Sequence, residues 1–251
     1  MIKVAQFQRK PFPGFYSVER LFRDVREYLP ATIECKVVVS KFQSKGLIRR
    51  VVNIIEAAFR STDVNHVTGD VHFLTFLLPR RRTLLTVLDC IRLTELSVWR
   101  WWLFWFLWYW LPAKRSAAIT VISHSTKRQL LDFVHYDAQK VSVIYPAVSN
   151  SFRAVPKEGL SPIPVLLQVG TTKNKNLERV IQALQGIPSH LRIIGPLSAA
   201  QLKLLEESRL EYSFKWGLSE LEIVDEYVKS DVVILVSTYE GFGFPIVETN
   251  A

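Results

Sequence analysis

The sequence has little cysteine, no secretion signal and no hydrophobic run long enough to cross a bilayer. Its two cysteines, Cys35 and Cys90, lie in apolar strand-like stretches. A disulfide framework and a cysteine metal site are therefore excluded, and we expect two buried thiols in a reducing cytoplasm. The N-terminus, MIKVAQFQRKPF, lacks the apolar core of a signal peptide, so none is predicted.

Acidic residues are scarce in the first part of the chain. Residues 1–155 hold 23 Lys and Arg against 11 Asp and Glu, a net charge of +12, whereas residues 156–251 hold 9 against 12, a net charge of −3. This asymmetry suggests an anionic partner, either a lipid surface or a nucleic acid, with a merely solvated basic face as the alternative. No helix-turn-helix, zinc or RNP signature is present, so nucleic-acid binding depends on charge alone.

Apolar residues make up 49% of the chain and charged residues 22%, which is enough for a packed core. Short runs rich in Val and Ile alternate with segments of helical periodicity. Strands are predicted at residues 2–7, 35–39, 64–67, 84–88, 119–122, 141–144, 165–169, 191–194, 212–214 and 232–236. Amphipathic helices are predicted at residues 17–29, 48–59, 125–133, 177–184, 199–207 and 221–228, the last with a Ser219–Glu222 capping box.

This alternation predicts an α/β protein whose parallel sheets are covered by helices on both faces. Residues 146–164 are rich in Pro, Ser and Gly and interrupt the periodicity, so we interpret them as a linker. The predicted domains are residues 1–150 and 151–251. Ligands of such sheets bind beyond the carboxyl ends of the strands, so residues just after strands are the site candidates.

A tryptophan-rich segment runs from Trp99 to Pro112, and its unbroken apolar part, residues 101–111, is shorter than the ~20 residues that a bilayer requires. Arg100 precedes this part, and Lys114 and Arg115 follow it. Because Trp favours the headgroup region and cations favour anionic lipids, an interfacial anchor is one interpretation. A helix buried between domains or in a protein contact is the other. The predicted membrane contacts are Trp101, Trp102, Trp105 and Trp108.

The C-terminal stretch VSTYEGFGFPIVE is the most informative. A buried strand leads into a loop that begins at Glu240, Pro245 suits the first turn of a helix, and Glu248 lies about one turn into it. Glycine amides and a helix N-terminus favour a phosphate, and two carboxylates accept hydrogen bonds from sugar hydroxyls. The alternative is a plain strand–turn–helix with no ligand.

The motif E-G-F-G-F-P-I-V-E resembles the E-x7-E signature of retaining glycosyltransferases with the GT-B fold. Other segments resemble the same family in the same order: AAITVISHSTKRQLLDF, VSVIYPAVSNSF, VLLQVGTTKNKNLERVIQAL and LRIIGP. The first 110 residues match more loosely, through NHVTGDVHFL and TLLTVLDC. The resemblance implies two Rossmann-like domains, the second of which binds a nucleotide sugar.

The resemblance also implies roles for individual residues. Glu240 would contact the donor sugar, Glu248 the ribose hydroxyls, and Lys175 the diphosphate, whose charge it would stabilise as the glycosidic bond breaks. The further donor-binding candidates are Gly241, Phe242 and Gly243 in the loop, Gly170 and Thr171 after the preceding strand, and Gly14, which would approach the diphosphate from the first domain.

The sequence departs from the family at several positions. Many relatives have an arginine at the position of Thr171, so one phosphate cation is absent here unless Lys173 substitutes for it. Many relatives carry His-Asp in the first domain, where this sequence has Leu88 and Asp89. Besides Glu240, the catalytic candidates are therefore Asp89 and His72, which follows a neighbouring strand. The alternative for His72 is a purely structural role.

Relatives also continue beyond the second glutamate, so the second domain is expected to be incomplete at Ala251. The implied activity is transfer of a hexosyl group from a UDP- or GDP-sugar to a glycan or lipid-linked saccharide, with retention and without a metal or another cofactor. The expected location is the cytoplasm, peripheral at the inner face of the cell membrane. The alternative is a truncated, non-catalytic remnant that keeps nucleotide or membrane binding. A dinucleotide-dependent oxidoreductase is excluded, because G-x-G-x-x-G is missing.

Overall fold

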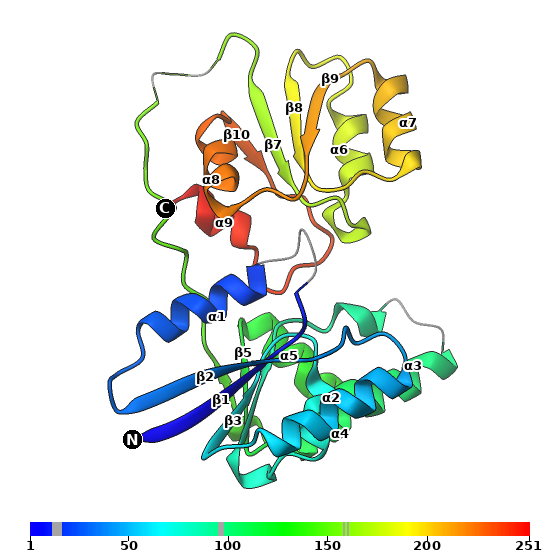
Figure 1. Cartoon of the computed structure of the whole chain (residues 1–251). Helices are drawn as coiled ribbons and strands as arrows, with labels where there is room; N and C mark the ends of the chain where they lie inside the picture. The colour runs from blue at the N-terminus through cyan, green and yellow to red at the C-terminus, as the bar shows by residue number, and fades with distance from the viewer. Residues whose placement is uncertain (12–16, 95–97, 158, 160) are drawn as a thin grey trace. The chain divides into compact units, whose positions relative to one another are not determined.

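The computed structural model describes residues 1–11, 17–94, 98–157, 159 and 161–251. The chain forms two compact units, Met1–Ala147 and Val148–Ala251, and each contains a parallel sheet with helices around it (Figure 1). The division lies three residues before the predicted domain boundary. The predicted α/β class with two Rossmann-like domains is confirmed.

The first unit is built on a sheet of order β2-β1-β3-β4-β5-β6, in which all pairs are parallel. The strands are β1 (Ile2–Gln8), β2 (Ile33–Val39), β3 (Val64–Val67), β4 (Thr83–Val87), β5 (Ala118–Val121) and β6 (Val141–Val143). The helices are α1 (Ser17–Glu27), α2 (Leu47–Phe59), α3 (Val98–Trp105), α4 (Leu111–Lys114) and α5 (His124–Phe133). Short helical turns lie between them: η1 (His72–Phe76), η2 (Arg80–Arg82), η3 (Ile91–Thr94), the π-helical η4 (Phe106–Trp110) and η5 (Ala138–Lys140).

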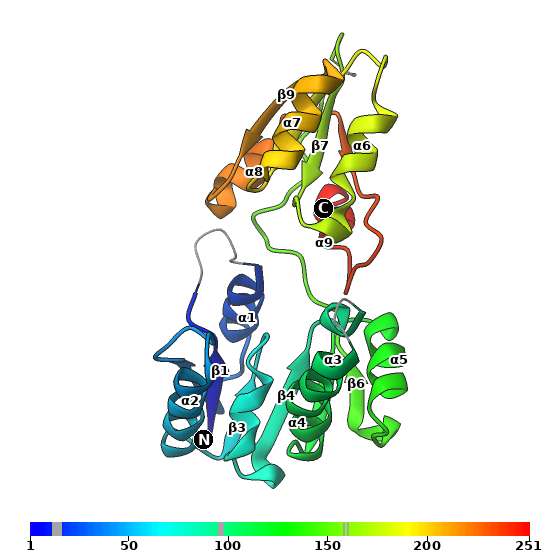
Figure 2. The ribbon, with the colours of Figure 1, turned by 90° about the vertical axis from the view of Figure 1, so that its right-hand side faces the viewer.

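Figures 1 and 2 show α2, α3 and α4 together on one side of this sheet. The inner strands are well buried. Alternate side chains are buried in β3 and β5, as in Val67, Ile119 and Val121, and the last four residues of β1 are all buried, because helices cover both faces. The sequence predicts these strands to within one or two residues.

Helix α2 has the predicted bounds but an unusual orientation. Its buried residues are Asn53 and Ala57. The Asn53 amide donates to the Phe42 carbonyl oxygen at 2.8 Å, and its Oδ1 accepts from the Phe42 amide at 3.1 Å. A buried amide needs such partners, and this bond fixes which side of the helix faces the sheet.

The second unit contains a sheet of order β10-β7-β8-β9, again with every pair parallel. Its strands are β7 (Val165–Val169), β8 (His190–Ile194), β9 (Glu211–Lys215) and β10 (Val232–Ile234). Its helices are η6 (Lys173–Lys175), α6 (Leu177–Ala183), α7 (Ala199–Ser208), α8 (Glu220–Val228) and α9 (Phe244–Thr249). The predicted Ser219–Glu222 capping box at the start of α8 is confirmed.

The segment interpreted as a linker packs on the second unit. The Ser149 hydroxyl donates to Glu220 Oε1 at 2.6 Å, and the Phe152 ring meets Tyr227 edge-on with centroids 5.3 Å apart. Phe152 is buried. The start of this segment is therefore part of the second folded unit and not a free connection.

Candidate functional site

The candidate site lies where the strand order of the second sheet reverses. Successive strands β7, β8 and β9 run outward in one direction, and β10 lies on the other side of β7. Lys175 follows β7 and Glu240 follows β10, so both come from the carboxyl ends of adjacent parallel strands. Ligands of open α/β sheets bind at this kind of switch point.

Lys175 and Glu240 contact each other directly. The Lys175 Nζ lies 2.5 Å from Glu240 Oε1, and the two side chains are 17% and 26% exposed. A charge-assisted pair at this distance and depth is a strong contact. The structure therefore brings together two of the predicted donor-site residues.

The backbone below this pair is shaped to hold the lysine. Gly170 has φ +92°, and a Cβ atom there would lie 3.1 Å from both Cγ and Cε of Lys175. The buried Gln168 side chain donates to the Lys175 carbonyl oxygen at 3.0 Å and to that of Gly170 at 3.4 Å. The lysine stem thus lies across a glycine that no larger residue can replace without displacement.

Two asparagines join the loop after β7 to the loop after β10, and the sequence analysis missed them. Asn174 Nδ2 donates to the Tyr239 carbonyl oxygen at 3.1 Å, and the Asn174 carbonyl oxygen accepts from the Thr238 amide at 2.8 Å. Asn176 Nδ2 donates to the Val236 carbonyl oxygen at 3.2 Å. Asn176 has φ 61°, a left-handed conformation that Asn tolerates better than most residues. An asparagine directly before a predicted helix was the available signal.

The glycine loop leads into a short helix, as predicted. Gly243 has φ +88° and precedes α9, and Pro245 lies in the first turn. The Phe242 ring packs against Phe244, with centroids 5.4 Å apart. Gly241 lies between Glu240 and Phe242 and has an ordinary negative φ. The helix carrying Glu248 therefore forms, with six residues.

Glu248 is oriented by a neighbouring helix. The Tyr227 hydroxyl of α8 donates to Glu248 Oε2 at 2.6 Å. Tyr227 in turn packs on Phe152, so a line of contacts connects Glu248 to the start of the second unit. The sequence predicts the position of this carboxylate but not its tyrosine partner.

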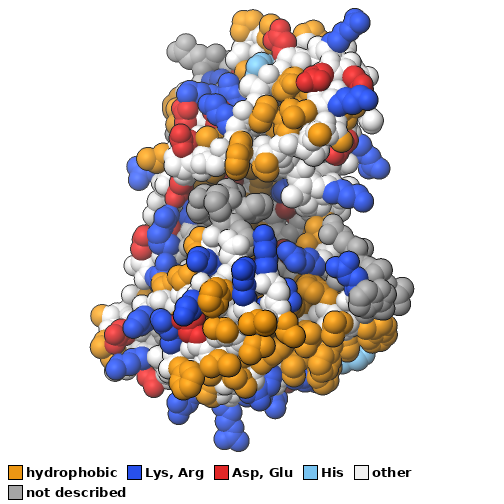
Figure 3. Space-filling model, turned by 45° about the vertical axis from the view of Figure 1, so that its right-hand side comes forward, with side chains coloured by type: hydrophobic (Ala, Val, Ile, Leu, Met, Phe, Trp, Pro, Cys, Tyr) orange, Lys and Arg blue, Asp and Glu red, His pale blue; other side chains and the backbone are white. Residues whose placement is uncertain are grey.

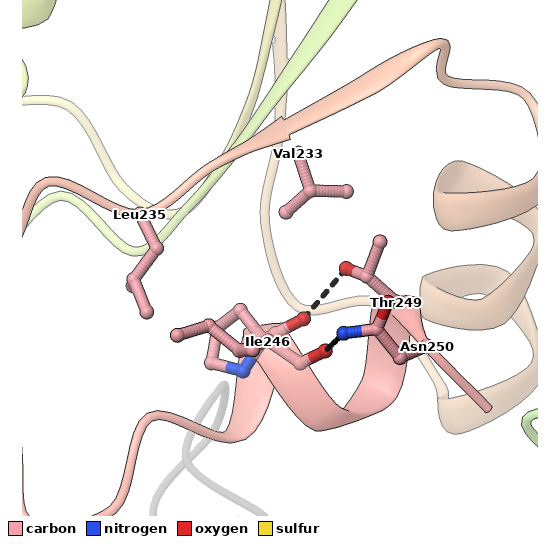
Figure 4. A pocket seen from close by; sticks show the side chains of 6 residues that line it. Val233, Leu235, Ile246, Thr249 and Asn250 are labelled. Atoms are coloured by element: carbon pink, nitrogen blue, oxygen red, sulfur yellow. Dashed lines mark hydrogen bonds between the residues drawn. The ribbon is translucent and has the colours of Figure 1, made fainter.

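An apolar hollow lies between β10 and α9 (Figure 4). Its lining residues are Val233, Leu235, Pro245, Ile246, Thr249 and Asn250. The Thr249 hydroxyl and the Asn250 amide donate to backbone carbonyl oxygens of α9. Lys175, Glu240 and Glu248 are not among the residues that line this hollow.

The side chain of Thr171, a predicted donor-binding residue, is bonded within the fold. Its hydroxyl donates to the Pro196 carbonyl oxygen at 2.5 Å, and the residue is 9% exposed. Its carbonyl oxygen accepts from Gln201 Nε2 at 2.9 Å. Thr171 therefore connects the loops after β7 and β8, and its role in donor binding stays a prediction. Lys173 nearby is exposed.

The structure corrects the catalytic prediction for His72. The residue is buried, and its ring Nδ1 lies 2.6 Å from the Trp108 carbonyl oxygen. The Gly69 backbone provides another hydrogen bond, and Tyr109 packs edge-on at 5.5 Å. Burial lowers the pKa of His72 below its usual value. It is a structural histidine whose ring is bonded to backbone, because the chain folds η4 over it.

Asp89 follows β4 and lies close enough to His72 to interact with it electrostatically. Its Oδ1 accepts from the Ile91 amide at 3.1 Å. Burial raises the pKa of Asp89, and the Ile91 hydrogen bond opposes this change. Asp89 and His72 are thus neighbours, but the histidine offers no free ring nitrogen to a substrate.

Gly14 lies outside the described residues. The beginning of its loop is held by Arg9, which follows β1. Arg9 Nε lies 2.8 Å from Glu19 Oε1, and Arg9 Nη1 lies 3.7 Å from Asp70 Oδ1.

The four predicted membrane tryptophans do not share one environment. Trp108 is 8% exposed, and its indole N–H donates to the Asp70 carbonyl oxygen, so the prediction that it contacts lipid is wrong. Trp105 donates to the Phe133 carbonyl oxygen at 2.6 Å and stacks on Trp101, and both are half-buried. Trp102 is 58% exposed. Only Trp102 of the predicted set is therefore exposed, whereas Trp101 and Trp105 are partly accessible.

Among the described residues, no set of three or more His, Cys, Asp or Glu side chains could bind a metal ion. Within the same residues, every helix is too short or too polar to cross a membrane.

Comparison with known proteins finds a sequence similarity in the second unit. Residues 155–251 match the sequence model of the glycosyl transferases group 1. This glycosyl transferase match includes the loops after β7 and β10, and therefore Lys175, Glu240 and Glu248. It covers less than half of the chain. No curated protein matches the chain in sequence.

Solved structures resemble the whole chain. The Anabaena protein HepE in complex with UDP and glucose has a TM-score of 0.73 at 14% identity, over 99% of this chain and 78% of HepE. Starch synthase IV of Arabidopsis thaliana, bound to ADP and acarbose, has a TM-score of 0.64 at 11% identity, over 99% of this chain and 80% of that domain. The UDP-GlcNAc 2-epimerase of Neisseria meningitidis, bound to UDP-GlcNAc, has a TM-score of 0.56 at 14% identity, over 92% and 76%. At these identities the likeness establishes the fold.

Proposed function

We propose that this protein is a glycosyltransferase that moves a hexosyl group from a nucleotide diphosphate sugar to a glycan or lipid-linked saccharide, with retention and without a metal. The observation that carries the proposal is the 2.5 Å contact between Lys175 and Glu240 at the strand switch point. The glycosyl transferases group 1 match over residues 155–251 supports the same reaction class. The alternative, a non-catalytic remnant, would keep the binding site without turnover.

The chemistry assigned to the pair follows from its charges. Lys175 would neutralise the diphosphate as the bond to the sugar breaks, which is where negative charge develops. Glu240 would accept hydrogen bonds from the sugar hydroxyls, since an ionised carboxylate only accepts. In the absence of the donor, Glu240 accepts a hydrogen bond from the Lys175 ammonium group. The incoming diphosphate therefore has to compete with this carboxylate for Lys175. Glu248 and the Gly241–Gly243 backbone complete the proposed donor site.

UDP is the first nucleotide to test. HepE and the epimerase are both described with UDP compounds, whereas the starch synthase is described with ADP. An aromatic side chain is available to stack on a base: Trp216 directly follows β9 and is 61% exposed. A hydrogen bond joins the carboxyl ends of β8 and β9: the Gly195 amide donates to the Lys215 carbonyl oxygen at 2.8 Å. We assign the nucleotide base of the donor to the part of the site beside the ends of β8 and β9.

The reaction is tested by turnover of UDP-hexoses, measured as UDP release with and without saccharide acceptors. Glu240→Gln keeps the size of the side chain but removes its charge. We expect turnover to fall by about 10²-fold or more, while UDP binds as tightly as before or more tightly, because Lys175 loses its carboxylate partner. Glu206→Gln, at an exposed glutamate of α7, is the matched control and should behave as wild type.

Wild-type turnover by Glu240→Gln would remove Glu240 from the mechanism. UDP-hexose binding without turnover, by wild type with every acceptor tried, would favour the non-catalytic alternative. No binding of any nucleotide sugar would reject the proposal as a whole.

A further inference from the structure

Helix α2 exposes its apolar side. Five of its hydrophobic residues are exposed, with Ile48 at 80% and Phe59 at 87%; the full set is Leu47, Ile48, Val51, Ile55 and Phe59. Val51, Ile55 and Phe59 are spaced by four residues and therefore share one helix face. Leu47 and Ile48 extend this face by one turn. We refer to these five residues as the α2 stripe.

The orientation of α2 is fixed by the fold. The Asn53 amide is committed to the Phe42 backbone on the opposite side, and Asn53 is 1% exposed. Ala57 is buried beside it. The inward side of α2 also carries Ile54 and Ala57, which pack in the core. The helix is therefore apolar on both sides, and its outward side presents an apolar surface that water covers poorly.

A second exposed apolar group continues this surface. Trp102 and Leu103 are 58% and 57% exposed, and Phe106, one turn later, is also exposed. The turn η1 packs against both α2 and η4, and Leu77 at its end is exposed. The Arg50 guanidinium lies 4.7 Å from the Trp108 ring, which connects α2 to η4 directly. Figure 3 shows hydrophobic side chains gathered over this face of the first unit, with Lys and Arg at its margin.

Exposed cations are carried by α2, by α3 and by η2 of the same unit. Arg49 of α2, Arg60 just after α2 and Arg100 of α3 are exposed, and η2 consists of three exposed arginines, Arg80–Arg82. The only carboxylate on α2, Glu56, pairs with Arg60 at 3.0 Å. Residues 1–147 hold 22 Lys and Arg against 11 Asp and Glu, a net charge of +11.

We propose that this face of the first unit docks on an anionic lipid surface, with the α2 stripe and the Trp102–Phe106 group among the acyl chains and the arginines at the headgroups. Apolar and aromatic residues beside cations form the pattern of interfacial helices. Helix α2 has 13 residues, about 20 Å, which suits lying in the interface and not crossing it. A symmetric pair of chains joined through this face would bring like-charged arginine clusters together. The proposal concerns the first unit alone and does not depend on the donor site.

The test is flotation of the full chain with vesicles of phosphatidylcholine, with and without about a third of phosphatidylglycerol, which supplies the anionic surface. We expect binding to the anionic vesicles that weakens at high salt. Ile48→Gln combined with Phe59→Gln should reduce the partition coefficient by about tenfold or more, because two large apolar side chains no longer insert. Both positions are exposed, so folding should be unaffected. The control Ile187→Gln with Leu221→Gln, at exposed positions of the second unit, should bind as wild type.

A second readout locates the bound face. Brominated lipids should quench tryptophan fluorescence, and Trp102→Phe should remove most of this quenching, whereas Trp216→Phe should not. The proposal is overturned if wild type does not bind anionic vesicles, or if the α2 double variant binds as wild type does. A dimer in solution that the double variant dissociates, without vesicle binding, would assign the face to a second copy and also overturn it.

Discussion

Gly170 combines two constraints at one position. Its φ of +92° is costly for any residue with a Cβ atom, and such an atom would press on the Lys175 stem at 3.1 Å. We therefore expect Gly170→Ala to destabilise the protein by about 1–2 kcal/mol and also to weaken UDP binding through displacement of Lys175. Urea unfolding and titration with UDP measure the two effects.

Gly186 provides the matched control. It has φ +78°, and a Cβ atom there would meet nothing within 4 Å. Gly186→Ala should lose a similar amount of stability and leave UDP binding unchanged. Equal losses of UDP affinity in both variants would show that the close approach at Gly170 has no special role.

Single residues also show where sequence reasoning reaches its limit. The family resemblance implies that Lys175 and Glu240 face the same donor, and their positions just after strands are consistent with this, since ligands bind beyond the carboxyl ends of parallel strands. A position after a strand does not predict the direction of a side chain. Thr171 and His72 also follow strands, yet Thr171 bonds to Pro196 and His72 to Trp108. Those partners lie at positions distant in sequence, so no local pattern indicates them.

At the level of elements, a polar ladder crosses three central strands of the first sheet. His66 Nε2 of β3 lies 2.7 Å from Thr86 Oγ1 of β4, which lies 2.7 Å from Thr120 Oγ1 of β5. Burial lowers the pKa of His66 from 6.5 to about 4, so the folded state holds this ring neutral. The free energy of unfolding should therefore depend on pH through His66.

The sign of this dependence follows from proton uptake. Between pH 6.5 and about 4 the unfolded chain protonates His66 and the folded chain does not, so the free energy of unfolding falls as pH decreases. The contribution of neutral His66 to the free energy of unfolding is fully present above pH 6.5. At pH 5 about 2 kcal/mol of this contribution is lost. His66→Gln should remove this part of the pH dependence in urea unfolding at pH 7 and pH 5. The exposed His135→Gln should keep it, and equal slopes for both variants would refute the assignment.

Helix α2 marks another limit at the same scale. Its periodicity predicts a helix with correct bounds, because the pattern of apolar residues reports amphipathicity. The same pattern is produced by a helix that faces a sheet and by one that faces a lipid. The Asn53 contact with Phe42, across a loop, shows which side of α2 faces inward, and this contact is not part of the apolar pattern.

At the scale of the whole molecule, the two units differ in net charge and in their similarity to known proteins. The first unit carries +11 and the second, with 10 Lys and Arg against 12 Asp and Glu in residues 148–251, carries −2. The family match covers the second unit, while the fold likeness covers both. The order of the strands and of the amphipathic helices was predictable, because alternating apolar runs determine it, but the helices at residues 98–114 were not. The contacts of the Trp-rich segment were not, since a segment that is apolar all round has no preferred face.

The central claim is that Lys175 receives the donor diphosphate, and calorimetric titration with UDP tests it most directly. Lys175→Met should weaken UDP binding by about 10- to 100-fold, the loss expected for one charge-assisted contact. Lys173→Met, at an exposed lysine two residues earlier, should stay within about threefold of wild type. Wild-type affinity in Lys175→Met, or a larger loss in Lys173→Met, would contradict the account.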